Sequence, residues 1–345
     1  MKMNNLLYHH IPMRRPRQYR LKPDPVLDQT FNEEEIRNKF RFTRNGVYFI
    51  HDLLHDDLVR ETDRNNALSV MTQVQTGLRF FADHSNQNNV GELVGVVKSS
   101  VSKVCRDFSR ALLNHAGEFI YFPNTQAEKN EIKQEFYDFA GMPSVLGCID
   151  GTHVRIVRPK DNEADFVNRK NFHSINVQVL TDSKYRIRDV VARWPGPTHD
   201  SFIFTSSYIK TYLDTHNTRL QDGIILGDSG YALLPYLMTP YLNPATAQER
   251  NYNRSHKSTR SSVEKSIGQL KRRFPLLLYT MRADPETACL HIAAACVLHN
   301  IAKMLNEPDF EGDDDDDEMD IDPRLIQPAH PNGPIVRRYI TTTFF

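Results

Sequence analysis

The chain has 345 residues, of which 39% are hydrophobic and 25% are charged, and this length is sufficient to bury the core of a globular protein. The formal net charge of zero hides an uneven distribution. Residues 307–322 hold eleven acids and no Lys or Arg, which leaves 43 basic residues against 32 acids elsewhere, about +11. A positively charged body favours a polyanionic partner such as DNA.

The cysteine and hydropathy patterns argue against a secreted or membrane protein. The four cysteines are scattered without a Cys-x-x-Cys spacing, which is typical of reduced core residues rather than of a disulfide framework. Neither a signal peptide nor a run of about 18 apolar residues is present in the sequence. We therefore expect a protein of the nucleus, also found in the cytoplasm, with no membrane partner.

Residues 1–27 are predicted to form a disordered basic arm. A cluster of basic residues and several prolines precede the first acid, Asp24, and this composition disfavours a packed core. The cluster comprises Arg14, Arg15, Arg17, Arg20 and Lys22. Such an arm contacts phosphates or serves as a nuclear address, and a solvated tail without either role is the alternative.

Residues 28–140 have a helical pattern, and their middle part has the pattern of a helix-turn-helix. A short helix at 90–95 is followed by a break at 96–99 and a second helix at 100–113. On the second helix we expect Val101, Val104, Cys105, Phe108 and Leu112 to be buried and Ser100, Lys103, Arg106 and Arg110 to face outward. The outward face has donors for bases and phosphates in a major groove. A plain helical bundle with solvated basic residues is the alternative.

The pattern changes after a helix at 127–140, capped by Thr125 and ended by Gly141. Three consecutive antiparallel strands are predicted from segments at 145–150, 153–157, 172–180 and 186–193, with turns at Gly151-Thr152 and 181–184 and an excursion at 159–169. A helix at 202–213, a strand at 224–226 and helices from 247, the last at 285–305, follow. This order predicts an α/β domain at 141–306, a mixed sheet flanked by helices. The acidic residues 307–345 are predicted to be a disordered tail.

Three carboxylates of the predicted domain have the character of metal ligands. Asp150 and Asp228 each end a buried apolar strand, and Glu264 lies on a basic amphipathic helix. Carboxylate oxygens suit hard cations such as Mg²⁺ or Mn²⁺, and two such ions can activate water and stabilise the leaving oxygen in phosphodiester cleavage. Asp150, on the first and central strand, is the expected bridging ligand. The cations Lys257, Arg260 and Lys271 share roughly the side of Glu264 and would hold DNA phosphates at the metals.

Other polar residues compete for roles. Asp200 is a further candidate ligand or a partner of the ligands, although its position before a helix favours an N-cap. Asp182 lies in a turn and is expected to be structural. His153 either orients a carboxylate or phosphate or is a satisfied buried histidine, whereas His299 and Asn300 are expected to bond within the core.

Five blocks of sequence, in order, resemble those of the PIF/Harbinger transposase family and of the nucleases that hosts have derived from it. The blocks are Gly147-Cys148-Ile149-Asp150-Gly151-Thr152-His153-Val154, Trp194-Pro195-Gly196-Pro197-Thr198-His199-Asp200-Ser201, Leu226-Gly227-Asp228-Ser229-Gly230-Tyr231, Val263-Glu264-Lys265 with Leu270-Lys271-Arg272-Arg273-Phe274, and Ala295-Cys296-Val297-Leu298-His299-Asn300-Ile301. The similarity covers about residues 30–305.

The resemblance implies a ribonuclease-H-like core whose Asp-Asp-Glu triad falls on Asp150, Asp228 and Glu264, with no substitution in the triad. It also implies a separate Myb-like DNA-binding protein as partner, which would carry the chain into the nucleus and would lessen the role of the internal helix-turn-helix. We predict a transposase-derived, divalent-metal-dependent DNA endonuclease. A catalytically silent DNA-binding or chromatin interaction protein and an active Harbinger-type transposase are the alternatives, and the chain is either a monomer or a homo-oligomer.

Overall fold

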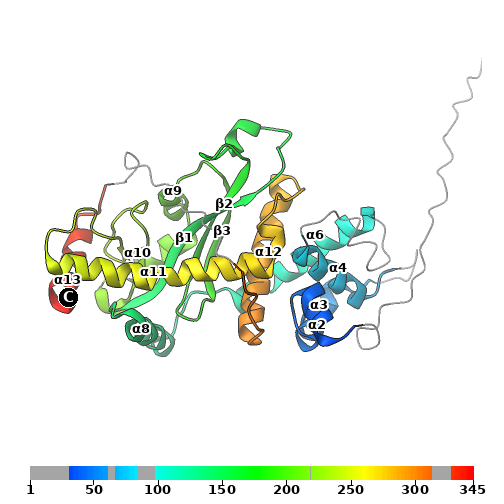
Figure 1. Cartoon of the computed structure of the whole chain (residues 1–345), viewed down its shortest axis with the longest axis horizontal. Coiled ribbons are helices and arrows are strands. Elements are labelled where there is room, and N and C mark those ends of the chain that lie inside the picture. The colour runs from blue at the N-terminus through cyan, green and yellow to red at the C-terminus, as the bar shows by residue number, and fades with distance from the viewer. Residues whose placement is uncertain (1–30, 61–66, 84–97, 218, 313–327) are drawn as a thin grey trace, which may run out of the picture.

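The N-terminal part of the fold is a group of helices. The computed structural model describes residues 31–60, 67–83, 98–217, 219–312 and 328–345 (Figure 1). The helices of this part are α2 (Glu33–Phe40), α3 (Arg44–Leu58), α4 (Val70–Ala82), α6 (Lys98–Asn114) and the short α7 (Ala116–Phe119). Hydroxyl and amide side chains begin the first three, since Asn32, Thr43 and Ser69 accept hydrogen bonds from backbone N–H groups of the first turns.

The helix-turn-helix remains a prediction. Its first helix, at 90–95, lies outside the described residues, and its second corresponds to α6, which begins two residues earlier than expected. The predicted apolar face of α6 is buried, with Val101 and Phe108 fully so, while Lys103 and Arg110 are exposed and Arg106 is half-buried. The amphipathic pattern therefore correctly identified which face of this helix packs inward.

A mixed sheet of five strands forms the centre of the described structure, in the order β3-β2-β1-β4-β5. The strands are β1 (Val145–Arg155), β2 (Ser174–Thr181), β3 (Ile187–Pro195), β4 (Ile224–Leu226) and β5 (Leu237–Met238). The first three are antiparallel neighbours, as predicted, and β4 and β5 add parallel to β1. A mixed sheet flanked by helices is thus confirmed, and it is consistent with the ribonuclease-H-like fold.

The predicted turn at Gly151-Thr152 is wrong, because β1 continues through it. Gly151 pairs with Gln178 and Thr152 pairs with Val177 in the ladder with β2. A glycine followed by threonine in a run of branched residues was interpreted as a turn, but a neighbouring strand that pairs on both sides of the glycine keeps it extended. The consequence is a long central strand that carries Asp150 in its middle.

Helices cover both faces of the sheet (Figure 1). They are α8 (Gln126–Ala140), α9 (Asp200–Thr205), α10 (Tyr208–His216), α11 (Ala247–Arg273), α12 (Pro285–Met304) and α13 (Gly333–Phe344), with short 3-10 turns η1 (Glu163–Phe166), η2 (Leu220–Asp222) and η3 (Pro275–Leu277). The predicted cap by Thr125 at the start of α8 and the predicted end at Gly141, which has a left-handed conformation, are confirmed. The helix predicted at 202–213 is two helices, since Ser206 is the C-cap of α9 and Ser207 is the N-cap of α10.

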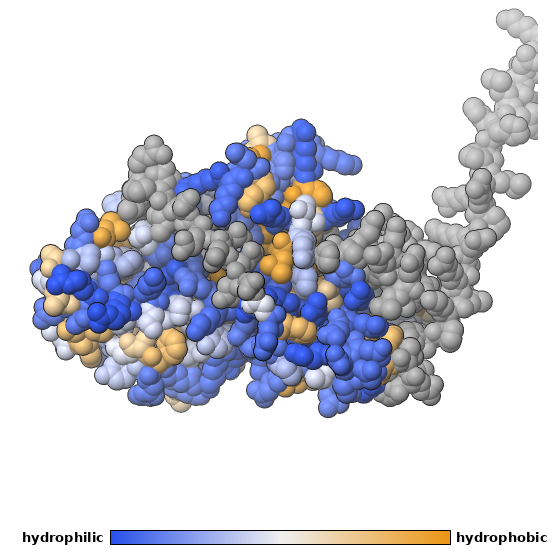
Figure 2. Space-filling model, in the orientation of Figure 1, coloured by the Kyte–Doolittle hydropathy of each residue, from blue (hydrophilic) through white to orange (hydrophobic). Residues whose placement is uncertain are grey.

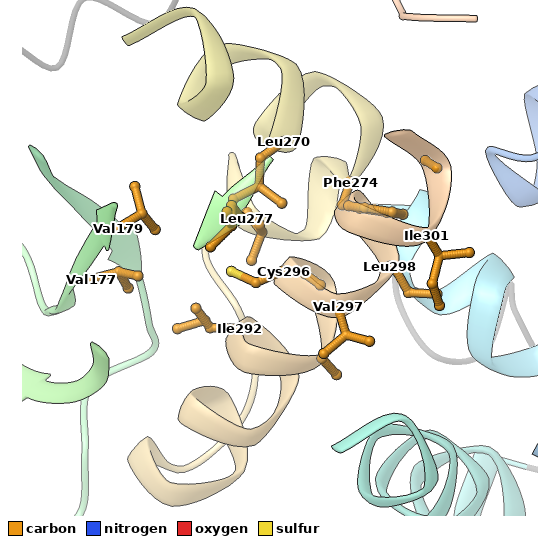
Figure 3. Packing of buried hydrophobic residues seen from close by; sticks show 14 of the residues in the cluster. Val177, Val179, Leu270, Phe274, Leu277, Ile292, Cys296, Val297, Leu298 and Ile301 are labelled. Atoms are coloured by element: carbon orange, nitrogen blue, oxygen red, sulfur yellow. The ribbon is translucent and has the colours of Figure 1, made fainter. Parts of the chain in front are cut away.

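Alternate residues of the strands face two apolar clusters. Cys148, Val179 and Leu226 face α11 and α12, whereas Ile149 and Leu180 face α9 and α10. Figure 3 shows Ile292 and Cys296 of α12 directed toward the valines of β2, while Leu298 and Ile301 point to the opposite side, toward the N-terminal helices. Although α12 is long and apolar enough to cross a membrane, 67% of its apolar window is buried, so it acts as a core helix that joins the sheet to the helical part.

The predicted disordered tail needs correction over the described residues 307–312 and 328–345. Gly333–Phe344 forms α13, which packs beside β5 and α11, and Ile340 is fully buried. Glu307 accepts hydrogen bonds from the backbone N–H and hydroxyl of Thr43, at the start of α3. The prediction of disorder rested on the acidic composition of the whole segment, which is dominated by the acidic run at 313–322. That run lies outside the described residues. In the view of Figure 2, hydrophilic residues cover most of the described surface and apolar residues lie in small patches.

Candidate active site

The register of two neighbouring strands brings Asp150 and Asp228 together. The strands β1 and β4 run parallel, and their last registered pair joins Cys148 to Leu226. Each aspartate lies two residues beyond its member of that pair, so the two are at the same level of the sheet. Because β4 ends at Leu226, the flank of β1 beside Asp150 is left for side chains rather than for a neighbouring strand.

Backbone N–H groups hold both carboxylates in place. The N–H of Gly230 donates to Oδ1 of Asp228 over 3.0 Å, and the N–H of Gly151 donates to Oδ1 of Asp150 over 3.0 Å. A Cβ added to Gly227 would lie 2.8 Å from the buried ring of Tyr231, so the loop after β4 requires glycine there. These backbone contacts fix the position of the acids before any ligand binds.

Glu264 reaches the same place from α11. This helix packs over β1, and Cys148 Sγ contacts the carbonyl oxygen of Thr259 at 3.5 Å. One helical turn separates Arg260 from Glu264, which places both side chains on the face that overlooks Asp150. Glu264 and Asp150 therefore lie on either side of Arg260, with Asp150 in the middle of its strand rather than at the end that the sequence predicted, and the metal site itself stays a prediction.

The guanidinium of Arg260 bridges two of these acids. Its Nη1 donates to Oδ2 of Asp150 over 2.6 Å, and its Nη2 donates to Oε1 of Glu264. The side chain of Asp150 is 15% exposed and that of Arg260 is 21% exposed, so their ion pair is largely shielded from water. Arg260 was predicted to contact DNA phosphates, but in this structure it is occupied by the carboxylates.

Asp200 is a fourth acid at this site, supplied by α9. The N-cap of α9 is His199 and Asp200 is its first helical residue, so the N-cap interpretation of Asp200 is wrong. Oδ1 of Asp200 instead accepts a hydrogen bond of 2.9 Å from Asn176, whose amide also donates to the carbonyl of Thr198. Sequence reasoning missed Asn176; its signal is an amide within an otherwise branched, fully buried strand.

Burial and mutual repulsion make these acids hold protons more tightly than usual. Burial raises the pKa of Asp150 to about 6, with Asp228 and Glu264 acting in the same direction and Arg260 opposing them. Burial, with the charges of Asp228 and Asp150, raises the pKa of Asp200 to about 7. Burial also raises the pKa of Asp228, against the effect of Arg260. Acids with raised pKa values gathered in one place are typical of functional sites.

The donor set suits a hard divalent cation, although the present arrangement is not a finished metal site. Asp150, Asp228 and Glu264 supply oxygen ligands from three elements, the chemistry that Mg²⁺ and Mn²⁺ prefer. Over the described part of the chain, no group of three His, Cys, Asp or Glu side chains is already placed to hold an ion. In this structure the guanidinium of Arg260 lies between Asp150 and Glu264 and bonds both.

The remaining basic residues that were predicted to contact DNA differ in their exposure. Lys257 is exposed on α11, but Lys271 is only 2% exposed, which contradicts a surface contact with phosphate. The helical stripe was assigned without knowing that the end of α11 is covered by other elements. Lys103 lies 2.6 Å from Asp107, and Arg110 lies 3.8 Å from the same acid.

The residues expected to be structural are so. Asp182 is fully buried and pairs with Arg186 and Arg188, each at 2.9 Å. His299 Nε2 donates to the carbonyl of Tyr185, and Asn300 bonds the backbone of Ile187. His153, for which two roles were left open, is half-buried and contacts Ser174 Oγ at 3.2 Å, and its role stays a prediction.

Comparison with known proteins supports the same assignment. Residues 149–300, which contain the triad, match the family described as DDE superfamily endonuclease. The chain is 35% identical over 286 residues to the putative nuclease HARBI1 of Rattus norvegicus and, to the same degree, to that of Homo sapiens, covering 82% of this chain and 80% of theirs. It is 28% identical to the protein ALP1-like of Arabidopsis thaliana, over 76% of this chain and 69% of that protein. No solved structure matches the chain.

These relatives and the site agree. The sheet places Asp150 of β1 and Asp228, which follows β4, near a helix glutamate, inside the matched residues, and the similarity extends over most of the chain. The chain therefore belongs to the family of harbinger transposase-derived nucleases, within the DDE superfamily endonucleases.

Proposed function

We propose that this protein hydrolyses DNA phosphodiester bonds with the help of Mg²⁺ or Mn²⁺ held by Asp150, Asp228 and Glu264. The observation that carries the proposal is that Asp150 of β1 and Glu264 of α11 both bond the guanidinium of Arg260, while Asp228 lies at the level of Asp150 beyond the end of the neighbouring parallel strand β4. Several carboxylates gathered beside one half-buried arginine are costly to the fold unless they have a partner cation, and a divalent ion would be such a partner. The printed names of the relatives, putative nucleases, support the reaction class.

The chain's own residues divide the work. A bound divalent cation supplies Lewis acidity and lowers the pKa of water. Asp150 and Asp228 are fixed by the backbone N–H groups of Gly151 and Gly230, and their carboxylates would hold the cation that binds the reacting phosphate. Asp200, with a pKa of about 7 and oriented by Asn176, is suited to hold or release a proton at its carboxyl oxygen near neutral pH.

DNA binding, partner and location form part of the same proposal. The exposed Lys103, Arg110 and Lys257, with the half-buried Arg106, are proposed to contact phosphates, and the helix-turn-helix is proposed to position the duplex. Sequence recognition is assigned to a separate Myb-like protein that brings this chain into the nucleus. A homo-oligomer would present two sites to the two strands.

The test is nicking of supercoiled plasmid by purified full-length protein in Mn²⁺ or Mg²⁺. We expect Asp150→Ala and Glu264→Ala to abolish nicking while circular dichroism shows an intact fold. Asp138→Ala, at an exposed acid of α8, is the matched control and should cut as the wild type does. Unchanged cleavage by both site variants would reject the assignment.

A silent DNA-binding or chromatin protein is the second candidate function, and Arg260 is the observation that favours it. An arginine that bridges two would-be ligands resembles the satisfied state of a structural ion pair. Tight DNA binding by a folded wild-type protein that never cuts in Mn²⁺ would support this candidate over the nuclease.

A further inference from the structure

We propose that Arg260 is an internal cation that occupies the metal-binding position of the carboxylate site and must withdraw before a divalent ion can bind. This inference rests on the proposed function, since it concerns how the same site is loaded. Arg260 would keep the acids assembled in the metal-free protein and would compete with the metal for them. Its expected signature is that removing Arg260 strengthens metal binding.

The bonding geometry of Arg260 is that of a bridging cation. Its two Nη atoms bond different carboxylates, Asp150 on β1 and Glu264 on α11, rather than both oxygens of one carboxylate. By joining acids that are 114 residues apart in sequence, counted from Asp150 to Glu264, the guanidinium makes the connection that a shared ion would make.

The charge balance points in the same direction. The guanidinium of Arg260 bonds Asp150 and Glu264, and Asp228 lies at the level of Asp150 beyond the end of the neighbouring strand β4. Three acids act on this one cation, and they therefore retain an excess of negative charge even when it is in place. A divalent ion would neutralise that excess better than a monovalent guanidinium does.

Arg260 also has a route out of the site. Its side chain is 21% exposed, and it extends from the surface of α11 on a long flexible stem. Arg188, by comparison, is 3% exposed and is held by both Asp182 and Glu128. An arginine with access to solvent can exchange its carboxylate partners for water at modest cost, whereas a sealed one cannot.

The experiment is calorimetric titration of Mn²⁺ into full-length protein at pH 8, with thermal unfolding in EDTA as a readout that does not require activity. Arg260→Ala and Arg260→Gln are expected to bind Mn²⁺ about tenfold more tightly than the wild type, a change of about 1.4 kcal/mol. Arg260→Lys keeps a positive charge but loses the forked guanidinium, so its affinity for Mn²⁺ should lie between that of the wild type and that of Arg260→Ala. Arg254→Ala removes an exposed arginine of the same helix and should leave the affinity unchanged.

The thermal measurement separates a folding defect from a metal effect. In EDTA the Arg260→Ala variant should unfold at a lower temperature than the wild type, because its acids are unpaired, and Mn²⁺ should raise its unfolding temperature by more. Folded Arg260→Ala and Arg260→Gln variants that bind Mn²⁺ no better than the wild type overturn the inference. Mn²⁺ binding that survives in Asp150→Ala/Glu264→Ala, or that is absent from every variant, overturns the proposed metal centre itself.

Discussion

Two buried clusters of acids and arginines in this protein have opposite balances. At the turn between β2 and β3, Asp182 accepts four hydrogen bonds, from the N–H groups of Lys184 and Arg186 and from the guanidinium groups of Arg186 and Arg188. At the site, Arg260 donates hydrogen bonds to Asp150 and Glu264 and also interacts electrostatically with Asp228. Donors exceed acids at the turn, whereas acids exceed cations at the site.

This difference separates structure from function. A carboxylate whose lone pairs are all satisfied has no capacity for a further cation, so Asp182 can only stabilise the fold. Burial, with the charges of Asp228 and Glu264 acting in the same direction, raises the pKa of Asp150 to about 6 although Arg260 opposes it, and these acids together carry more charge than one guanidinium neutralises. The excess of acid, rather than burial alone, distinguishes a site from a salt bridge.

The largest effect on stability is expected at the turn. Asp182→Ala should lower the free energy of unfolding by about 3–5 kcal/mol, because it leaves two guanidinium groups without their buried partner. Urea unfolding followed by circular dichroism measures this change. Asp150→Asn is the matched control at the site, where loss of one of several repelling acids should cost less than about 1 kcal/mol. Equal losses in the two variants would remove the contrast between the clusters.

A pH effect of intermediate size is expected from Asp189, which follows Arg188 on β3. Burial raises the pKa of Asp189 to about 7, so the folded state binds its proton more tightly than the unfolded state, whose ordinary pKa is 3.8. Its contribution to stability is therefore complete below about pH 4 and is lost as the pH rises to about 7. Asp189→Asn should flatten this slope and stabilise the protein at pH 8, by on the order of 1–3 kcal/mol.

The measurement is the urea midpoint of wild type and Asp189→Asn at pH 5 and pH 8. Asp182→Asn provides a contrast, since Asp182 is fully paired and its replacement should destabilise the protein at both values. If the urea midpoint of the wild type decreases no more from pH 5 to pH 8 than that of Asp189→Asn, the expectation is contradicted.

A smaller change in stability, with a complete change in activity, is expected at Glu264. This side chain is 51% exposed, so Glu264→Gln should alter the free energy of unfolding by less than about 1 kcal/mol. The same variant should lose metal-dependent nicking if the site is a nuclease. Thermal unfolding and the plasmid assay, made on one preparation, test the two statements together; a large loss of stability would make Glu264 a structural residue like Asp182.

The smallest effect is expected on the surface of α6. Lys103 is 59% exposed and already pairs with Asp107, so Lys103→Gln should weaken DNA binding by less than about 1 kcal/mol and lower the salt slope by about one. Fluorescence anisotropy with a short duplex at several salt concentrations measures both. Asp107→Asn, which frees Lys103 and Arg110, should strengthen binding, and unchanged affinity in both variants would exclude α6 from the DNA interface.

Local patterns were sufficient for the elements and for the identity of the acids. The caps of Thr125 and Gly141, the apolar face of α6 and the strand that ends before Asp228 are short-range features, and the structure agrees with them, whereas Asp150 lies in the middle of β1 rather than at its end. The pattern misled where a distant neighbour overrode it. Gly151 stays extended because β2 pairs with it, and Asp200 faces Asn176 instead of capping its own helix.

By itself the sequence determined which acids are the candidates for the chemistry, because a carboxylate that follows an apolar run and a glutamate on a basic helix are visible without coordinates. Only the tertiary structure decided what those acids bind in the metal-free protein. Arg260 and Asp150 are far apart in sequence and meet because α11 packs across β1. Electrostatic interactions depend on distance in space and on burial, and neither is a property of the linear chain.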